Sequence, residues 1–239
     1  MDVVRLGRAV LLTVLLGTVS APAVAQQTGV RVQVLLAGRA PRMALQARKT
    51  SDPVCVNKNP WATEEEALVH VGGGIKNVAV YVSRNAPQGA PRDVELNHQG
   101  CTYRPRVSVM SATGSLKVAN NDATNHSVHI YKGTKTLVNV LQPAGSPVVT
   151  RQFAQYAGSF LRVRCDQHPW EVAFVVVAPS SVMGVTGEQG DLLLPELGPG
   201  SYTLTAWHER WGFKTADVTV GPEGRGDVKI LYEGNEPRP

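Results

Sequence analysis

The stretch at 164–171 reads Arg-Cys-Asp-Gln-His-Pro-Trp-Glu, and it joins two apolar runs, 160–163 and 172–177, that have the composition of β-strands. It places a thiol, Cys165, and an imidazole, His168, three positions apart in a loop. A loop of this kind can turn both side chains toward one ion. One Cys with two His is a ligand set for copper, and a weaker axial donor commonly follows the loop His by a few residues.

The second histidine has to come from elsewhere, and His126, in Asn-His-Ser-Val-His at 125–129, is the natural partner. It follows Asn-Asn-Asp at 120–122, a typical inter-strand turn. His129 lies three residues further on, so on a strand it points to the opposite face. We interpret His129 as structural or surface and keep it as the alternative ligand. The predicted metal ligands are His126, Cys165, His168 and, as a possible axial donor, Glu171.

The composition around this stretch predicts an all-β protein. Helical periodicity is nearly absent, and short runs rich in Val, Ile, Tyr and Thr are cut by Gly, Pro and Asn, as in β-sandwiches and barrels. Strands this short bury one face each and need a second sheet to cover it. We therefore expect a Greek-key β-sandwich over 28–178. Its strands are predicted at 29–34, 76–82, 94–96, 106–110, 115–119, 127–131, 148–153, 159–163 and 172–177.

Other segments divide the chain. Residues 40–67 are rich in Pro and charge and are predicted to be irregular, with at most one helical turn at 63–67. Pro-Ser-Ser at 179–181 has the composition of a linker. A small second β module is expected at 182–232, where glycine-containing turns separate short strands. The last residues, 233–239, are expected to be a disordered tail.

The first 25 residues have the features of a secretory signal peptide. Arg5 and Arg8 form a basic segment, 9–16 is a mostly apolar run, and Ala-Val-Ala at 23–25 is a small-residue cleavage site. The apolar run is far shorter than the roughly 20 residues that cross a bilayer, so cleavage is favoured over anchoring. We expect a periplasmic or secreted protein with no membrane span in the mature chain.

The chain has three cysteines. In an oxidising compartment two accessible thiols tend to pair, and Cys55 and Cys101 both lie in polar, loop-like surroundings. Pairing them in a disulfide leaves Cys165 as a lone thiol, which is protected from oxidation by burial or by a metal. Two alternatives stay open: a buried, inert Cys165, or a bridge from Cys165 to one of the other two.

Several other functions are disfavoured. The formal net charge of +5 is spread without a Lys/Arg block, so no nucleic-acid partner is expected. Cys165 and His168 resemble a nucleophile and its base, but no Asn or Asp is evidently placed to orient the base, so we do not expect an enzyme. His70 and His98 have no evident partners and are interpreted as surface residues.

With both motifs in view, 108–178 resembles the cupredoxins, most closely the amicyanin and plastocyanin-like branch. Amicyanins carry His-Asn-Val-His at one strand end and Cys-x-x-His-Pro-Phe-Met in a loop. The resemblance implies a β-sandwich that holds one copper ion and transfers single electrons in the periplasm, with a redox protein such as a cytochrome or dehydrogenase as partner. Carried over by position, His126 and His168 would bind through imidazole nitrogen and Cys165 through thiolate.

Two departures from that pattern matter. Ser127 stands where amicyanins have Asn, so the hydrogen bond that braces the loop is altered or comes from the hydroxyl. Glu171 stands where they have Met. A bound carboxylate is a hard donor that favours Cu(II), which lowers the reduction potential, whereas a Glu171 turned to solvent would leave three ligands.

The second module resembles the carboxypeptidase regulatory-like domains, which are transthyretin-like sandwiches and mostly non-catalytic. The likeness rests on the Thr-Gly-x-x-Gly turn at 186–190 and on 197–204, Leu-Gly-Pro-Gly-Ser-Tyr-Thr-Leu. Bacterial chains that join these two modules often carry the label of methylamine-utilisation proteins. The alternative function is a copper-binding or structural and interaction β-sandwich protein without redox traffic.

Overall fold

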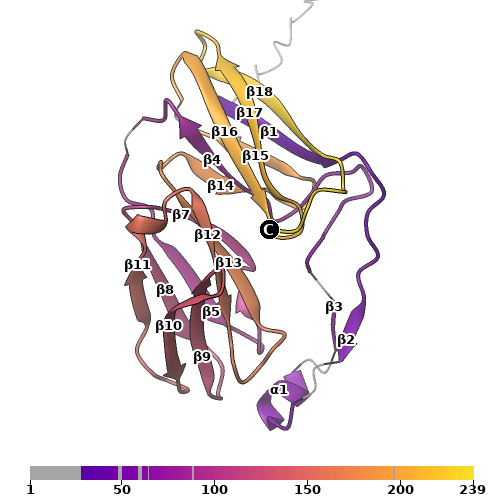
Figure 1. The fold of residues 1–239 in the computed structure, drawn as a ribbon, viewed down its shortest axis with the longest axis vertical. Helices are drawn as coiled ribbons and strands as arrows, with labels where there is room; N and C mark the ends of the chain where they lie inside the picture. Colours follow the sequence, from indigo (N-terminus) through magenta and orange to yellow (C-terminus); the bar gives the residue numbers. More distant parts are fainter. Residues whose placement is uncertain (1–27, 48–49, 59–60, 64, 88, 196) are drawn as a thin grey trace, which may run out of the picture.

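The computed structural model describes residues 28–47, 50–58, 61–63, 65–87, 89–195 and 197–239. The predicted signal peptide lies outside these residues. The described part is almost entirely β-structure, as expected, and its strands form two stacked sandwiches with an arm beside them (Figure 1). No helix in the described residues is both long enough and apolar enough to cross a bilayer.

The lower sandwich carries the motifs singled out in the sequence. Its five-stranded sheet has the order β10 (Lys135–Gln142), β9 (His126–Lys132), β12 (Ser159–Arg164), β13 (Val172–Ala178), β7 (Val107–Ser111). Its second sheet has the order β11 (Val149–Gln152), β8 (Ser115–Asn120), β5 (Val94–His98), β6 (Tyr103–Arg104). Alternate side chains from both sheets form one buried core, which includes Leu96, Leu116, Ile130, Leu161 and Val175.

The upper sandwich is also built from two sheets. The first has the order β14 (Met183–Val185), β4 (Ala79–Arg84), β16 (Gly200–His208), β17 (Gly212–Val220). The second has the order β15 (Asp191–Leu194), β1 (Gly29–Leu36), β18 (Arg225–Tyr232). Its core includes Val30, Val32, Ile75, Leu204 and Ile230, so β1 and β18, which lie far apart in the sequence, pack into the same core.

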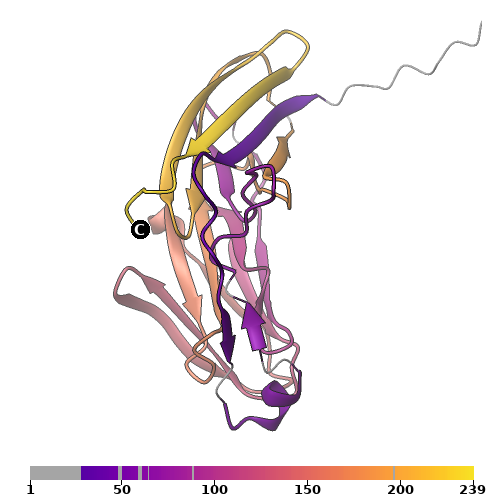
Figure 2. The same ribbon diagram turned by 90° about the vertical axis from the view of Figure 1, so that its right-hand side faces the viewer.

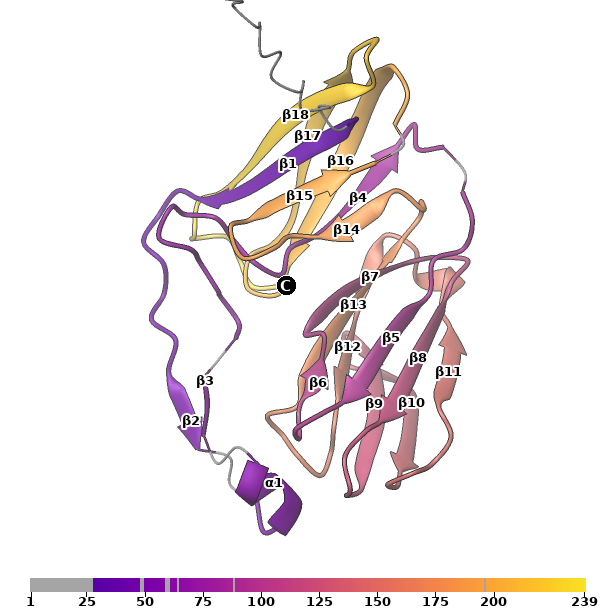
Figure 3. The same ribbon diagram turned by 180° about the vertical axis from the view of Figure 1, so that it is seen from behind.

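Two strands lie in a different sandwich from the one that the sequence predicted. We assigned 29–34 and 76–82 to the first module at 28–178, but β1 pairs in parallel with β18 and β4 pairs with β16 (Figure 3). The assignment was wrong because an alternating strand has an apolar face that fits either core, and local pattern does not choose the partner. The lower sandwich begins at β5.

The two sandwiches share a third buried cluster. Trp207 has no exposed surface, and its ring centroid lies 4.7 Å from that of Phe160 and 5.2 Å from that of Phe174. Beside it, the Arg106 guanidinium donates two hydrogen bonds to the Glu209 carboxylate, of 2.6 and 2.7 Å. Ser180, in the predicted linker, is buried. The two sandwiches are therefore packed against each other at this point.

Between β1 and β4 the chain leaves the upper sandwich and runs down to the far end of the lower one (Figure 2). This arm holds the short pair β2 (Leu45–Ala47) and β3 (Trp61–Thr63), and the helix α1 (Pro53–Lys58). The helix forms within the segment predicted to be irregular, where the Asp52 carboxylate accepts hydrogen bonds from the Val54 and Cys55 N–H groups and caps it. The sequence allowed at most one helical turn at 63–67, and the described residues 65–67 form no helix.

The predicted disulfide between Cys55 and Cys101 is confirmed, and it ties α1 to the loop between β5 and β6. Cys165 is the free thiol and is buried.

The C-terminal residues differ from the expected disordered tail, because Arg238 pairs with Glu66 on the arm and Glu236 pairs with Lys214.

Candidate metal centre

The four predicted ligands lie at one end of the lower sandwich. His126 is the first residue of β9, Cys165 directly follows β12, and Glu171 directly precedes β13. Since β12 is antiparallel to both β9 and β13, the end of β12 lies beside the starts of its two neighbours. His168 lies in the loop between Cys165 and Glu171, so the strand pairing brings all four side chains together.

Their donor atoms converge. The Nδ1 atoms of His126 and His168 are 3.1 Å apart, and Cys165 Sγ lies 3.7 Å from the first and 3.6 Å from the second. Glu171 Oε1 is 3.1 Å from His126 Nδ1 and 3.4 Å from His168 Nδ1. One donor atom from each side chain lies within 4.8 Å of every other, and none of the four residues is more than 1% exposed.

These separations fit a single bound ion. Two donors held at about 2.0–2.3 Å in a tetrahedral site stand about 3.3–3.6 Å apart, which is close to the five distances above. Glu171 Oε1 is buried and makes no hydrogen bond, although two imidazole nitrogens face it. A thiolate, two imidazoles and a carboxylate suit copper, and the same set also suits zinc. The residues present therefore fit the metal that the sequence predicted.

The electrostatics favour the metal-binding form of the cysteine. Burial would raise the pKa of the Cys165 thiol, but hydrogen bonds with His126 and His168 outweigh burial and lower that pKa to about 6. The thiolate also accepts a hydrogen bond from the Ser127 N–H, at 3.3 Å. For His126, burial opposes the charged form, but Cys165 and Glu171 raise its pKa to about 9. The thiolate is the form of cysteine that binds metals.

Glu171 does not turn to solvent. Its side chain is fully buried, and its Oε2 lies 2.8 Å from His98 Nδ1. Burial would raise the pKa of the Glu171 carboxyl, but the neighbouring His126 and His98 imidazoles lower it. Glu171 is therefore held as a carboxylate with one oxygen toward His98 and the other toward the two inner imidazoles.

His98 was missed by sequence reasoning and is not a surface residue. It has no exposed surface, and its ring stacks on His126 with 4.2 Å between centroids and 16° between planes. The signal was present in the sequence: Val94, Leu96 and His98 alternate along β5, and all three point into the core.

Ser127 braces the loop through its hydroxyl, which accepts a hydrogen bond of 2.7 Å from the Asp166 N–H. This is one of the two outcomes expected for a serine at this position. His129 lies outside the group of four donors: its Nδ1 is 2.9 Å from Asp166, and its ring stacks on Tyr131. The structure thus places His126, and not His129, among the donors around Cys165.

Comparison with solved structures finds copper proteins that resemble part of this chain. A Cu-containing nitrite reductase from Thermus scotoductus SA-01 is 16% identical over 40% of this chain, with a TM-score of 0.32, and the match spans only 24% of that reductase. A purple cupredoxin from Nitrosopumilus maritimus is 18% identical over 36% of this chain and all of its own, with a TM-score of 0.32. Amicyanin from Paracoccus versutus is 17% identical over 41% of this chain and 96% of its own, with a TM-score of 0.31.

At these TM-scores the likenesses carry no weight for function. No protein-family model matches the chain, and no curated protein matches it in sequence. What is known of the centre therefore comes from its own side chains.

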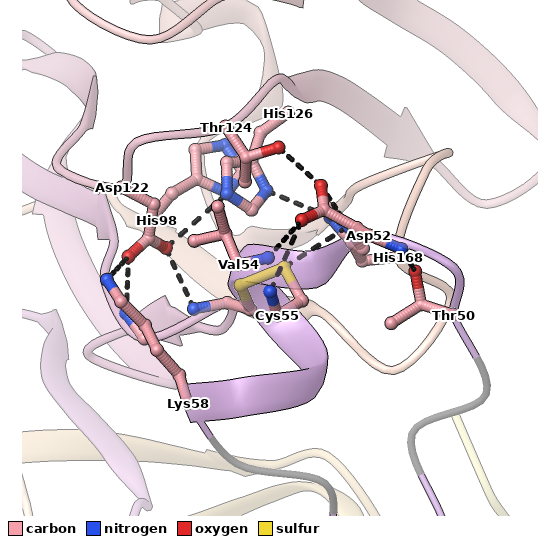
Figure 4. Close-up of a disulfide and its surroundings, with 12 residues drawn as sticks. Thr50, Asp52, Val54, Cys55, Lys58, His98, Asp122, Thr124, His126 and His168 are labelled. Carbon is pink, nitrogen blue, oxygen red and sulfur yellow. Dashed lines mark hydrogen bonds and ion pairs between the residues drawn. A yellow bond between two sulfur atoms is a disulfide. The ribbon is translucent and has the colours of Figure 1, made fainter.

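A second layer of polar groups lies against the outer edges of His126 and His168 (Figure 4). Cys55 Sγ is 3.3 Å from His168 Nε2, and Asp122 Oδ2 is 3.4 Å from His126 Nε2. Trp170 packs beside His168, with 5.1 Å between ring centroids, and its indole N–H donates to the Cys101 carbonyl. This layer, together with α1, covers the outer edges of both imidazoles, so the centre is closed on the side of the arm.

An enzyme that uses Cys165 as nucleophile and His168 as base was disfavoured because the sequence shows no Asn or Asp evidently placed to orient the base, and the structure corrects that point. An aspartate does face the base, because Asp52 Oδ2 lies 3.8 Å from His168 Nε2. Cys165 is nevertheless only 1% exposed and sits behind the disulfide and the two imidazoles. A nucleophile has to reach its substrate, so this burial disfavours hydrolysis.

Proposed function

We propose that the chain is an exported copper-binding protein that transfers single electrons at one mononuclear site, made by His126, Cys165, His168 and Glu171. The observation that carries the proposal is the convergence of these four buried donor atoms to within 4.8 Å of one another. Three of them, the two imidazole nitrogens and the cysteine sulfur, are the ligand set of a redox copper site.

The surrounding residues support electron transfer by keeping the donors fixed and dry. Strand ends hold His126 and Cys165, and the Ser127 hydroxyl braces the loop at Asp166. Trp170 and α1 keep water from His168. Copper, when bound, supplies a centre that gains and loses one electron. Donors that do not move and water that is excluded reduce the rearrangement that accompanies each transfer.

Glu171 sets the expected direction of the reduction potential. It is a hard oxygen donor with a negative charge, and His98 holds it in place at 2.8 Å. Such a donor stabilises Cu(II) more than Cu(I). We therefore propose a potential lower than that of the same site with a thioether at this position.

The location and partners belong to the same proposal. The basic, apolar and small-residue segments of the first 25 residues support export to the periplasm or beyond. A redox protein such as a cytochrome or dehydrogenase would exchange electrons with the site. The upper sandwich is proposed to be a non-catalytic, carboxypeptidase regulatory-like module.

A second candidate function is a metal-binding protein without redox traffic. Glu171 favours it, because a fourth, carboxylate donor completes a closed set that also suits Zn²⁺. The two candidates differ in one measurable respect: only the first requires that the bound metal change oxidation state reversibly.

An anaerobic titration of the metal-free chain with Cu(II) tests the proposal. We expect an intense thiolate-to-copper absorption in the visible that saturates at one equivalent, bleaches with ascorbate and returns on reoxidation. Cys165→Ser is the matched control and is expected to lose the band. A colourless complex, or oxidation of Cys165 without binding, would contradict copper redox function, and a preference for Zn²⁺ with no redox cycle would favour the second candidate.

A further inference from the structure

The disulfide Cys55–Cys101 lies directly against the outer edges of the two inner imidazoles (Figure 4). Each ring turns Nδ1 inward and Nε2 outward. His168 Nε2 lies 3.3 Å from Cys55 Sγ, and donor atoms of Asp52, Cys55 and His168 lie within 4.8 Å of one another. Cys55 Sγ and His168 Nε2 are therefore at the spacing of neighbouring metal ligands.

The other half of the disulfide has matching surroundings. Cys101 forms a similar group with Asp122 and His126, again within 4.8 Å. His126 Nε2 is buried and has no hydrogen-bond partner, and it lies 3.4 Å from Asp122 Oδ2. Two sulfurs, two imidazole nitrogens and two carboxylates thus form a second set of metal-type donors, with the sulfurs tied up in a bond to each other.

We propose that reduction of Cys55–Cys101 creates a second metal site, for Cu(I), formed by the Cys55 and Cys101 thiolates with His168 Nε2. Two thiolates and an imidazole are soft donors that select Cu(I). The two Cα atoms are 5.5 Å apart, so both sulfurs stay within reach of one ion after the bond breaks. The inference rests on the proposed function only in taking copper as the metal supplied.

The reductant is a dithiol. Its two thiols become a disulfide, the Cys55–Cys101 bond breaks, and each of the two sulfurs takes up one electron and one proton. Binding of Cu(I) then releases the two thiol protons, and it also releases the proton of His168 Nε2 when Nδ1 of the same ring holds the inner ion, so that His168 bridges the two ions as an imidazolate. Oxidation of the pair by a disulfide reverses the change and removes the site.

The position of this outer site gives it a role in loading. The four inner donors are at most 1% exposed, and the disulfide covers His126 and His168 on the side of the arm. Besides the disulfide, α1 is held near the centre by the Lys58–Asp122 ion pair of 2.8 Å and by the hydrogen bond between Thr124 and Asp52. Reduction removes the covalent tie between α1 and the loop from β5 to β6, so thiol redox state controls where Cu(I) first binds.

Counting bound Cu(I) tests the proposal. The full chain is prepared oxidised, with one titratable thiol, and dithiol-reduced and desalted, with three. Cu(I) is then titrated anaerobically in competition with bicinchoninate. We expect one tightly bound equivalent for the oxidised chain and two for the reduced chain. The double variant Cys55→Ser with Cys101→Ser, which is open but lacks both thiolates, is expected to bind one under either condition.

Cys165→Ser separates this proposal from the inner site. It is expected to bind one more equivalent of Cu(I) when reduced than when oxidised, whatever the fate of the inner centre. Equal stoichiometry in the reduced and oxidised wild type, or a second equivalent kept by the double serine variant, would overturn the outer site. So would a reduced chain that loses its native circular dichroism and binds Cu(I) without a fixed stoichiometry.

Discussion

His98 Nδ1 lies 2.8 Å from Glu171 Oε2, and neither side chain has any exposed surface. The same ring stacks on His126, so one residue contacts both a predicted axial donor and a predicted imidazole ligand. His98 therefore fixes the carboxylate from behind while it holds the orientation of the neighbouring ring.

His98→Phe should weaken Cu(II) binding. Phenylalanine keeps the stacking on His126 but removes the nitrogen that faces Glu171, which leaves a buried carboxylate without its partner. Loss of such an orienting contact costs about 10- to 100-fold in metal affinity. Competition titration with a chelator measures it. In a Glu171→Gln background the same substitution should have little effect, and an equal loss in both backgrounds would contradict the positioning role.

Glu171→Met should raise the reduction potential. A neutral thioether replaces a charged oxygen donor and stabilises Cu(I) relative to Cu(II). Protein-film voltammetry of both forms measures the shift, and Glu171→Gln separates loss of charge from the effect of sulfur. A potential that is unchanged in both variants would show that Glu171 is not a ligand.

The inner site follows from sequence because its parts are local. Cys165 and His168 are joined by a short loop, and His126 begins a strand after a recognisable turn. The outer layer could not be predicted in the same way. The disulfide that ties the arm to the loop between β5 and β6 was predicted, but its contact with His168 was not, because the packing of the whole lower sandwich decides how that loop lies relative to the Cys165 loop.

The fold shows the same division. The all-β class and most strands follow from alternation, which is a local property. The strands β10 and β18 were missed. Most of their residues are not fully buried, so their sequences show only a weak difference between an apolar and a polar face. The placement of β1 and β4 in the upper sandwich depends on which of the two cores buries their apolar faces. Tertiary packing decides that, and the local sequence pattern does not.

Trp207→Ala should destabilise both sandwiches. The ring is fully buried between Phe160 and Phe174, at the boundary between them. Truncation of a buried tryptophan costs about 3–5 kcal/mol. We expect a lower midpoint of urea unfolding and a transition that separates into two. Phe213→Ala is the control, since that side chain is 43% exposed, and it should change the midpoint much less.

His208 should make stability fall in acid. It is 1% exposed, stacks on Trp211, and its Nδ1 accepts a hydrogen bond from the Arg210 N–H, so the folded chain favours the neutral ring. Burial, and then repulsion from Arg106 and Arg210, lower its pKa to about 3. Between the unfolded pKa of about 6.5 and that value, the unfolded chain binds a proton that the folded chain does not.

The free energy of unfolding should therefore decrease as pH falls through this window, by roughly 2 kcal/mol between pH 7 and pH 5 from this residue alone. Urea titrations at several pH values measure it. Groups of the metal centre titrate as well, so the test is the difference between wild type and His208→Gln, which keeps a neutral acceptor. The variant should lose this part of the slope. Parallel stability curves for the two proteins would show that His208 takes up its proton in the folded chain.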